Sequence, residues 1–256
     1  MKIAIVTGAS SGLGRVYVKQ LDRQEKLDEI WAIARREDRL EALKAETGTP
    51  VRVLAYDLTA PASIDALEAL LQREAPEVRV LINAAGFGKI GSWRDISRAD
   101  CDSMILLNCR AAVDVTQLCL PYMKRGARIM EICSTAAFQP FPYVNVYAAS
   151  KAFLYRYTRA LRLELLGRGI RVTAVCPYWI RDTEFIGTAQ KTQNSSYVRH
   201  FPLASHERTV AGISTAVSRA GLPVATPGIM CTLHRVAAKF IPSELMMGIW
   251  ALLRRV

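Results

Sequence analysis

The chain has 256 residues, 51% of them hydrophobic, which is enough to bury the core of one domain spanning residues 1–256. The formal net charge is +11, but there is no long Lys/Arg tract and no nucleic-acid-binding signature, so nucleic acid is not an expected partner. The six cysteines form no CxxC pair and no cluster with histidine, so no metal site is predicted, and reduced thiols suit a cytoplasmic protein.

Apolar runs alternate with amphipathic segments along the chain. We predict strands at residues 2–6, 29–34, 51–55, 78–83, 128–133, 170–176 and 223–227, and helices at 12–21, 37–45, from Pro61 onward, 98–123 and 144–166. Because the strands are apolar on both faces and separated by helices, they indicate a parallel sheet covered on both sides. The expected fold is α/β, a Rossmann-type doubly wound parallel sheet of about seven strands, which binds ligands at the carboxyl ends of its strands.

A glycine-rich turn, TGASSGLG from Thr7 to Gly14, follows the first strand. Glycines leave room for backbone to approach a pyrophosphate, and the start of the next helix offers free N–H groups to it. Any strand-to-helix turn favours glycine, so the signal depends on its place at the first strand–helix junction. The expected cofactor-binding residues here are Gly8, Ser10, Ser11, Gly12, Leu13 and Gly14.

The second predicted strand ends in Ala34 and is followed by Arg35 and Arg36. An acid at this place binds the ribose hydroxyls of NAD(H), whereas arginines suit the additional 2′-phosphate of NADP(H). A solvated helix start is the alternative, but cations are disfavoured at a helix N-terminus. The pair therefore favours NADP(H) over NAD(H).

Tyr147 and Lys151 lie four residues apart and share one face of the predicted helix 144–166. An ammonium near a phenol favours the phenolate, so we expect Lys151 to lower the pKa of Tyr147 toward the working range. Ser134, at the end of a neighbouring strand, can donate to the same substrate oxygen. An isolated Tyr-x-x-x-Lys pair would instead be a half-buried aromatic ring beside a surface cation.

Taken together, these segments resemble the short-chain dehydrogenase/reductase family, NADP(H)-preferring type, over residues 1–183. The glycine turn matches the family's TGxxxGxG motif, and residues 83–86 resemble its NNAG motif with Ala84 in place of the second asparagine. Ser134, Tyr147 and Lys151 match its catalytic serine and YxxxK motif, and Asn108 matches its catalytic asparagine. Each motif is common alone, but the combination is specific.

The resemblance implies a role for each of these residues. Tyr147 would be the general acid in reduction and the general base in oxidation, and Ser134 would polarise the carbonyl. Lys151 would bind the nicotinamide ribose and tune Tyr147, and Asn108 would support a water-linked proton relay to Lys151. Further cofactor contacts would come from residues after the third, fourth and sixth strands: Asp57, Leu58, Asn83, Ala84, Ala85, Gly86, Pro177, Ile180 and Thr183.

The sequence departs from the family after the sixth strand, where Tyr178 follows Pro177 in place of glycine. Tyr178, Trp179 and Phe185 are candidate substrate-lining residues, although the first two rings can equally point outward as packing. A substrate lid is expected at about residues 183–200. Its apolar side chains favour a lipophilic ketone or aldehyde as the small-molecule substrate.

The tail from residue 228 to 256 is rich in apolar side chains and ends in a basic pair. Three interpretations remain open: packing in the core or in a homodimer or homotetramer, a flap over the substrate site, or an interfacial helix that contacts a membrane peripherally. We expect no segment of the sequence to be long and uncharged enough to span a bilayer. An NADP(H)-dependent carbonyl reductase or alcohol dehydrogenase is the predicted function, and a non-catalytic NADP(H)-binding sensor or structural protein is the alternative.

Overall fold

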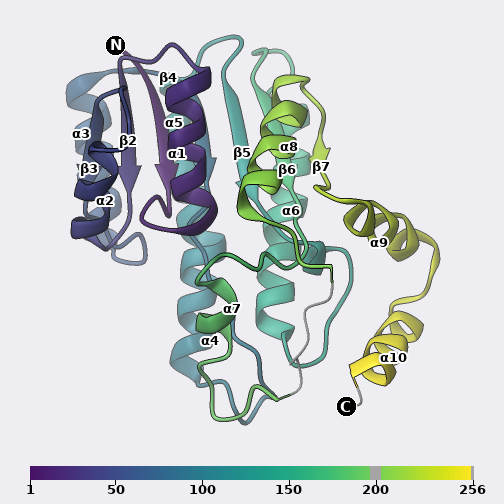
Figure 1. Cartoon of the computed structure of the whole chain (residues 1–256). Helices are drawn as coiled ribbons and strands as arrows, with labels where there is room; N and C mark the ends of the chain where they lie inside the picture. The colour runs from purple at the N-terminus through teal and green to yellow at the C-terminus, as the bar shows by residue number, and fades with distance from the viewer. Residues whose placement is uncertain (197–202, 255–256) are drawn as a thin grey trace.

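One seven-stranded parallel sheet organises the computed structural model, which describes residues 1–196 and 203–254 (Figure 1). The strand order is β3-β2-β1-β4-β5-β6-β7, so the direction of winding reverses beside the central strand β1. This confirms the predicted doubly wound fold and places its crevice at the carboxyl ends of β1 and β4. The strands are β1 (Lys2–Thr7), β2 (Glu29–Ile33), β3 (Val51–Leu54), β4 (Glu77–Asn83), β5 (Arg128–Ile132), β6 (Arg171–Val175) and β7 (Val224–Ala225).

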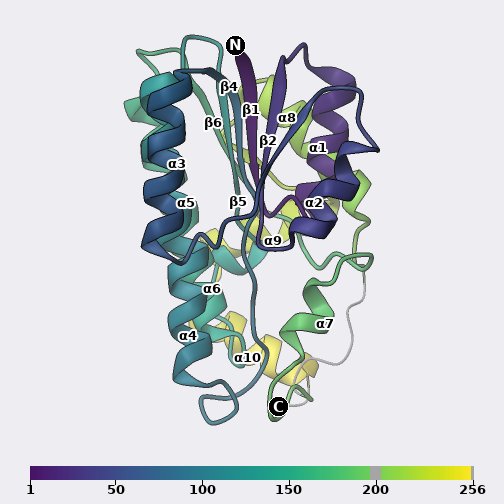
Figure 2. The ribbon, with the colours of Figure 1, turned by 90° about the vertical axis from the view of Figure 1, so that its left-hand side faces the viewer.

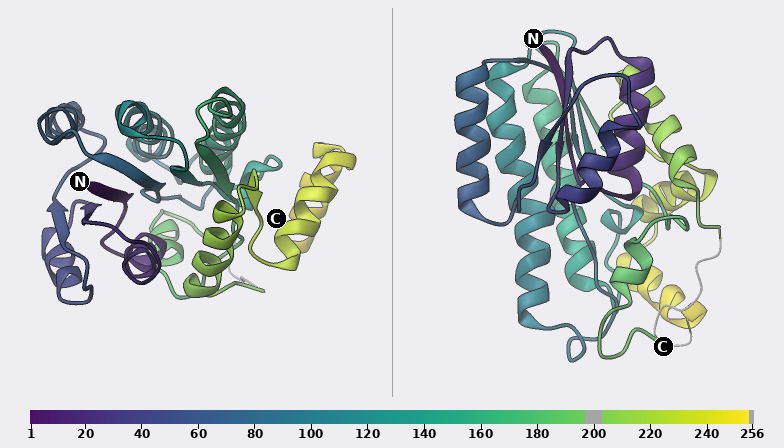
Figure 3. Two further views of the ribbon diagram at one scale, coloured as in Figure 1. Left: turned by 90° about the horizontal axis from the view of Figure 1, so that it is seen from above. Right: turned by 60° about the vertical axis from the view of Figure 1, so that its left-hand side comes forward.

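Helices cover both faces of the sheet, as the left view of Figure 3 shows. One layer holds α1 (Gly12–Gln24), α2 (Glu37–Lys44) and α8 (Glu207–Arg219), and the other holds α3 (Pro61–Glu74), α5 (Ala112–Cys119) and α6 (Asn145–Glu164). Successive strand residues point to opposite faces. In β1, Ile3 and Ile5 therefore pack into the core under α3, α5 and α6, whereas Ala4 and Val6 pack under α1, α2 and α8.

The helix predicted at 98–123 is continuous but not uniform. It consists of α4 (Arg98–Ile105), a π-helical turn η1 (Leu106–Ala111), α5 and a short 3-10 turn η2 (Leu120–Tyr122). The stretch Arg98–Tyr122 is long and apolar enough to cross a membrane by length and composition, which corrects the expectation from sequence. However, Val115 and Cys119 of α5 are fully buried against the sheet, as in the core helix of a globular domain.

Several elements extend past the carboxyl ends of the strands, where a ligand would bind (Figures 1 and 2). They are α4, α7 (Phe185–Ala189) from the predicted lid, and α10 (Ser243–Arg254), which follows α9 (Ile229–Phe240) in the tail. The end of the predicted lid, residues 197–200, and the last residue of the basic pair, Arg255, lie outside the described residues. The short turn η3 (Thr135–Ala137) follows β5.

Candidate active site

A cavity of about 660 Å³ lies at the carboxyl ends of the strands. Every residue predicted from the sequence to bind cofactor or substrate or to act in catalysis lines it, with the exceptions of Asn83 and Asn108. The lining therefore brings together the glycine turn, the arginine pair, the loops after β3, β4 and β6, and the start of α6. Across the described residues, 1–196 and 203–254, no three His, Cys, Asp or Glu side chains are grouped as a metal site.

The glycine turn between β1 and α1 is packed too closely for side chains. A Cβ atom on Gly14 would lie 2.2 Å from the carbonyl oxygen of Gly8, and one on Gly8 would lie 2.8 Å from the backbone nitrogen of Ala85. Gly8 also has a φ of 69°, in the left-handed region that favours glycine. The turn can therefore hold α1 against the end of β1 and keep its N-terminus open to the cavity.

The arginine pair lies beside this turn. Arg36 donates to the hydroxyl of Ser11 at 2.7 Å and to that of Ser10 at 3.2 Å. The Arg36 guanidinium also donates to the carboxylate of Glu184 at 2.8 Å. This end of the cavity is thus basic and rich in hydroxyl groups, as an anion-binding site requires.

Asp57 also lines the cavity, from the loop between β3 and α3. Burial alone would raise its pKa, but hydrogen bonds from Thr59 and the charge of Arg35 outweigh burial, so the pKa is lowered. The carboxylate Oδ1 accepts from the Thr59 backbone nitrogen at 3.0 Å and from the Thr59 hydroxyl at 2.7 Å. Asp57 is therefore an ionised, fixed acceptor at the cavity wall.

Asn83 is not part of the cavity lining, and its role as a cofactor contact stays a prediction. Its amide donates to Glu131 Oε1 and Thr116 Oγ1, both at 2.9 Å, in the layer between the sheet and α5. Only its neighbours Ala84, Ala85 and Gly86 reach the lining. Glu131 was not predicted from the sequence as a partner of Asn83, although an acid inside an otherwise mostly apolar strand such as β5 indicates a buried polar contact. Burial raises the pKa of Glu131 to about 7.

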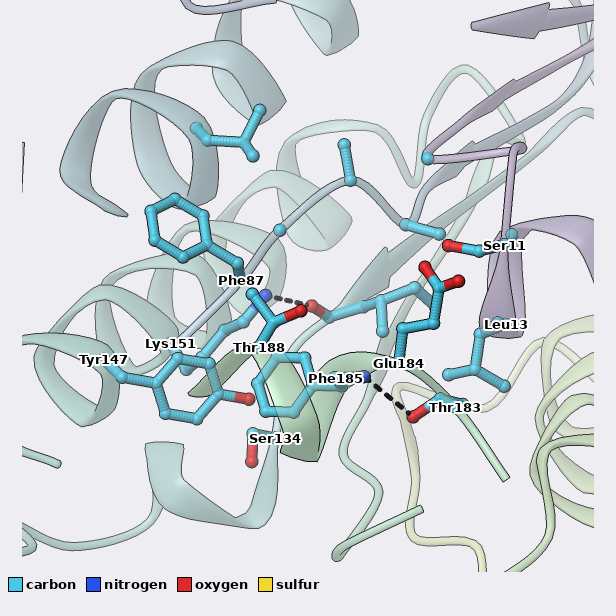
Figure 4. Close-up of a pocket in the computed structure, with 18 of the residues that line it drawn as sticks. Ser11, Leu13, Phe87, Ser134, Tyr147, Lys151, Thr183, Glu184, Phe185 and Thr188 are labelled. Atoms are coloured by element: carbon cyan, nitrogen blue, oxygen red, sulfur yellow. Dashed lines mark hydrogen bonds between the residues drawn. The ribbon is translucent and has the colours of Figure 1, made fainter. Parts of the chain in front are cut away.

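The candidate catalytic side chains come from the first turns of α6 and the end of β5. Figure 4 shows the phenol oxygen of Tyr147 pointing toward Ser134. Lys151 Nζ lies 6.0 Å from the centre of the Tyr147 ring and donates to the carbonyl oxygen of Ile132 at 2.7 Å. Ser134 Oγ accepts from the backbone nitrogen of Ala136 at 3.1 Å, and the Ser134 hydroxyl also forms a hydrogen bond with Tyr147.

The pKa of Tyr147 differs in direction from the expectation. Burial raises it to about 12, and the hydrogen bond with Ser134 offsets only part of this effect. Burial also lowers the pKa of Lys151. Desolvation therefore outweighs the predicted effect of the ammonium on the phenol, and Tyr147 is a proton donor at neutral pH.

Asn108 lies in the π-helical turn η1 and is fully buried. Its side chain accepts from the backbone nitrogen of Phe87 at 3.1 Å and donates to the Phe87 carbonyl at 2.9 Å and to Ser150 Oγ at 3.0 Å. It thus fastens the loop after β4 to α6. A Cβ on Gly86 would lie 2.8 Å from Asn108 Oδ1 and 3.2 Å from Lys151 Nζ, so glycine lets these two groups approach the loop. The water-linked relay stays a prediction.

Aromatic side chains form the other end of the cavity. Tyr178, Trp179 and Phe185 all line it, and Trp179 and Phe185 pack in one hydrophobic cluster with Tyr147. Tyr178 is not among the residues with positive φ, so the backbone here needs no glycine. Trp250 of α10 also lines the cavity and packs against Phe141 with ring centres 4.9 Å apart. Part of the tail therefore acts as a wall over the site, which agrees with the flap interpretation.

Comparison with known proteins identifies the family of the chain. The family description "short chain dehydrogenase" matches residues 2–194. The chain belongs to the short-chain dehydrogenase family, as its motifs predicted.

Individual relatives give a finer view. A sulfoacetaldehyde reductase from Chromohalobacter salexigens is 37% identical over 189 residues, which cover 70% of this chain and 72% of that protein. The NADP-dependent 3-hydroxy acid dehydrogenase YdfG from Escherichia coli is 32% identical over 205 residues, which cover 76% and 82%. A short-chain dehydrogenase from Sphingobium yanoikuyae, solved in complex with NADPH, superposes with a TM-score of 0.79 at 27% identity and covers 100% of this chain and 96% of that one.

Proposed function

We propose that this chain is an NADP(H)-dependent oxidoreductase that interconverts a lipophilic ketone or aldehyde and its alcohol, with Tyr147 as the proton donor or acceptor. One observation carries the proposal: a single cavity joins the basic, glycine-lined turn after β1 to Tyr147, Ser134 and Lys151. This arrangement supports anion binding at one end of a single space and proton transfer at the other.

The residues at the basic end fit NADP(H). Ser10, Ser11 and Arg36 offer hydroxyl and guanidinium donors to a 2′-phosphate, and the open N-terminus of α1 suits the pyrophosphate. The similarity to the NADP-dependent YdfG protein and to the NADPH complex from Sphingobium yanoikuyae supports this choice over NAD(H). When bound, NADP(H) supplies or accepts the hydride.

The chain's own residues would hold the carbonyl and move the proton. The Ser134 hydroxyl, which forms a hydrogen bond with Tyr147, would turn its proton to the carbonyl oxygen, since the backbone N–H of Ala136 uses only one of its acceptor positions. Tyr147 stays protonated because burial raises its pKa to about 12, and it can protonate the developing alkoxide. In the reverse direction Lys151 would help Tyr147 lose its proton, because an ammonium stabilises the phenolate.

The substrate end of the cavity supports an apolar substrate. Phe141, Trp179, Phe185 and Trp250 belong to the same hydrophobic cluster as Tyr147, and the Phe185 ring contacts that of Tyr147. Such a lining excludes water from the carbonyl and stabilises apolar groups next to it.

We further propose that residues 1–256 form one domain. We also propose that the chain assembles into a homodimer or homotetramer in the cytoplasm. Helix α9 supports self-association, because Ile229, Leu233, Val236 and Phe240 are exposed at spacings of four, three and four residues. These spacings place them on one face of the helix. An apolar stripe of this kind marks an interaction surface. Peripheral membrane contact by the same stripe is the alternative.

A screen of NADPH oxidation over a panel of apolar ketones and aldehydes tests the proposal. We expect Tyr147→Phe to bind NADPH like the wild type but to lose turnover by about 100-fold or more, because proton transfer loses its donor. Tyr155→Phe is the matched control, since Tyr155 lies two turns further along α6 and its hydroxyl contacts Arg159 instead. Near wild-type rates in Tyr147→Phe would refute the mechanism, and NADPH binding without turnover of any carbonyl would favour a sensor.

A further inference from the structure

A carboxylate already occupies the basic end of the cavity. Glu184 comes just before α7 and accepts hydrogen bonds from two arginines that are 148 and 145 residues earlier in the chain. The distances are 2.8 Å to Arg36 Nη1 and 2.6 Å to Arg39 Nη1. Figure 4 shows the Glu184 carboxylate directed toward Ser11 of the glycine turn. Arg36 directly precedes α2 and Arg39 lies in its first turn, so both guanidinium groups come from the start of one helix.

The anion that these groups would hold best is a phosphate. Arg36 donates to the hydroxyls of Ser10 and Ser11 through Nη2, so two guanidinium groups contact the carboxylate and two hydroxyl groups lie beside one of them. A carboxylate and a phosphate oxygen pair use the same fork of guanidinium donors. Arg39 and Arg36 lower the pKa of Glu184 to about 2, so this internal anion stays charged at physiological pH. About half of the Glu184 side chain is exposed (51%), so it can leave the site without crossing the core.

The position of Glu184 also sets the position of its neighbour. Phe185 follows directly in the chain, and its ring centre lies 5.5 Å from that of Tyr147. The tip of the Phe185 ring is close to the loop after β4, where a Cβ on Gly88 would approach it to 3.1 Å. Consecutive Cα atoms are only about 3.8 Å apart, so the two ion pairs of Glu184 hold the chain directly before Phe185, at the start of α7. The N-terminal end of α7 is therefore tied to the basic site through Glu184 and contacts Tyr147 through Phe185.

We propose that Glu184 is a specificity-determining latch, an internal carboxylate that holds α7 on Arg36 and Arg39 until a 2′-phosphate takes its place. This inference rests on the proposed binding of NADP(H). A dinucleotide without the 2′-phosphate leaves Glu184 on the arginines and Phe185 against Tyr147. A dinucleotide with the 2′-phosphate displaces Glu184 and releases the start of α7. The phosphate at one end of the cavity thereby controls the position of α7 at the other end.

The test measures binding of adenosine 2′,5′-bisphosphate and of 5′-AMP by titration calorimetry. In Glu184→Gln we expect the bisphosphate to bind about 5- to 10-fold more tightly than in the wild type, because two exposed ion pairs no longer compete. Binding of 5′-AMP should not change. Glu37→Gln is the matched control, since it removes the same charge from an exposed residue next to Arg36 that forms no ion pair in the described structure.

Hydrogen exchange of the α7 amides provides a second measurement. If Glu184 had only a structural role, the bisphosphate would not change the exchange rate of these amides. The bisphosphate should speed exchange in the wild type, whereas 5′-AMP should leave it unchanged, and Glu184→Gln should exchange fast from the start. Unchanged or weaker bisphosphate binding in Glu184→Gln, or exchange slowed by the bisphosphate, would overturn the latch alone. If the wild type binds neither the bisphosphate nor NADPH, the proposed function falls together with it.

Discussion

Replacement of the buried acid Glu131 by glutamine should change how stability depends on pH. Glu131 is fully buried in β5, where Asn83 and Thr116 both donate to its Oε1 atom. Burial raises its pKa from an ordinary 4.5 to about 7, more than these hydrogen bonds lower it. The folded state therefore holds a proton that the unfolded state loses at lower pH.

The size of the effect follows from the two pKa values. Each pH unit between them corresponds to about 1.4 kcal/mol, so ionising Glu131 costs the folded state about 3 kcal/mol above pH 7. The stabilisation by the protonated acid is fully present below about pH 4.5 and is lost as the pH rises through 7. Glutamine keeps the acceptor oxygen for Asn83 and Thr116 and carries no charge at any pH. Relative to the wild type, Glu131→Gln should therefore gain about 2 to 3 kcal/mol between pH 5 and pH 8.

Urea unfolding of both proteins at pH 5 and pH 8, at equal protein concentration, measures this difference. All other titrating groups are shared, so they cancel in the comparison. Glu68→Gln on α3 removes an exposed carboxylate and should show the same free-energy difference from the wild type at both pH values. If Glu131→Gln behaves like Glu68→Gln, burial does not hold a proton on Glu131 and the reasoning is refuted.

Three further predictions concern the cofactor end, the glycine turn and the tail. Arg36→Leu should weaken NADPH binding by roughly 10- to 100-fold and NADH binding much less, because a charged hydrogen bond to the 2′-phosphate is lost; equal losses in a fluorescence titration would contradict this. Gly14→Ala should lower the melting temperature, because its Cβ would lie 2.2 Å from a carbonyl oxygen, whereas Gly212→Ala, in open space on α8, should not; similar melting temperatures would argue against the tight turn. The double change Leu233→Glu and Phe240→Glu should lower the mass measured by light scattering. An unchanged mass with lost vesicle binding would favour the membrane interpretation of α9.

The sequence alone determined the parts of this protein that depend on short-range geometry. Apolar strands separated by amphipathic helices predicted the parallel sheet, because side-chain periodicity is a local property of the backbone. The Tyr147 and Lys151 spacing placed both on one face of α6, and the glycine spacing after β1 predicted a turn that only glycine fits.

Tertiary structure alone decided which distant groups meet and what burial does to them. Glu184 reaches Arg36 and Arg39, and Trp250 reaches Phe141, because the chain returns to the same strand ends after 100 residues or more. The orientation of the Asn83 side chain depends on its hydrogen bond to Glu131 of the neighbouring strand. The same holds for the pKa of Tyr147, which burial raises although its nearby lysine predicts the opposite. Desolvation depends on everything packed around a group, and no local pattern along the chain records it.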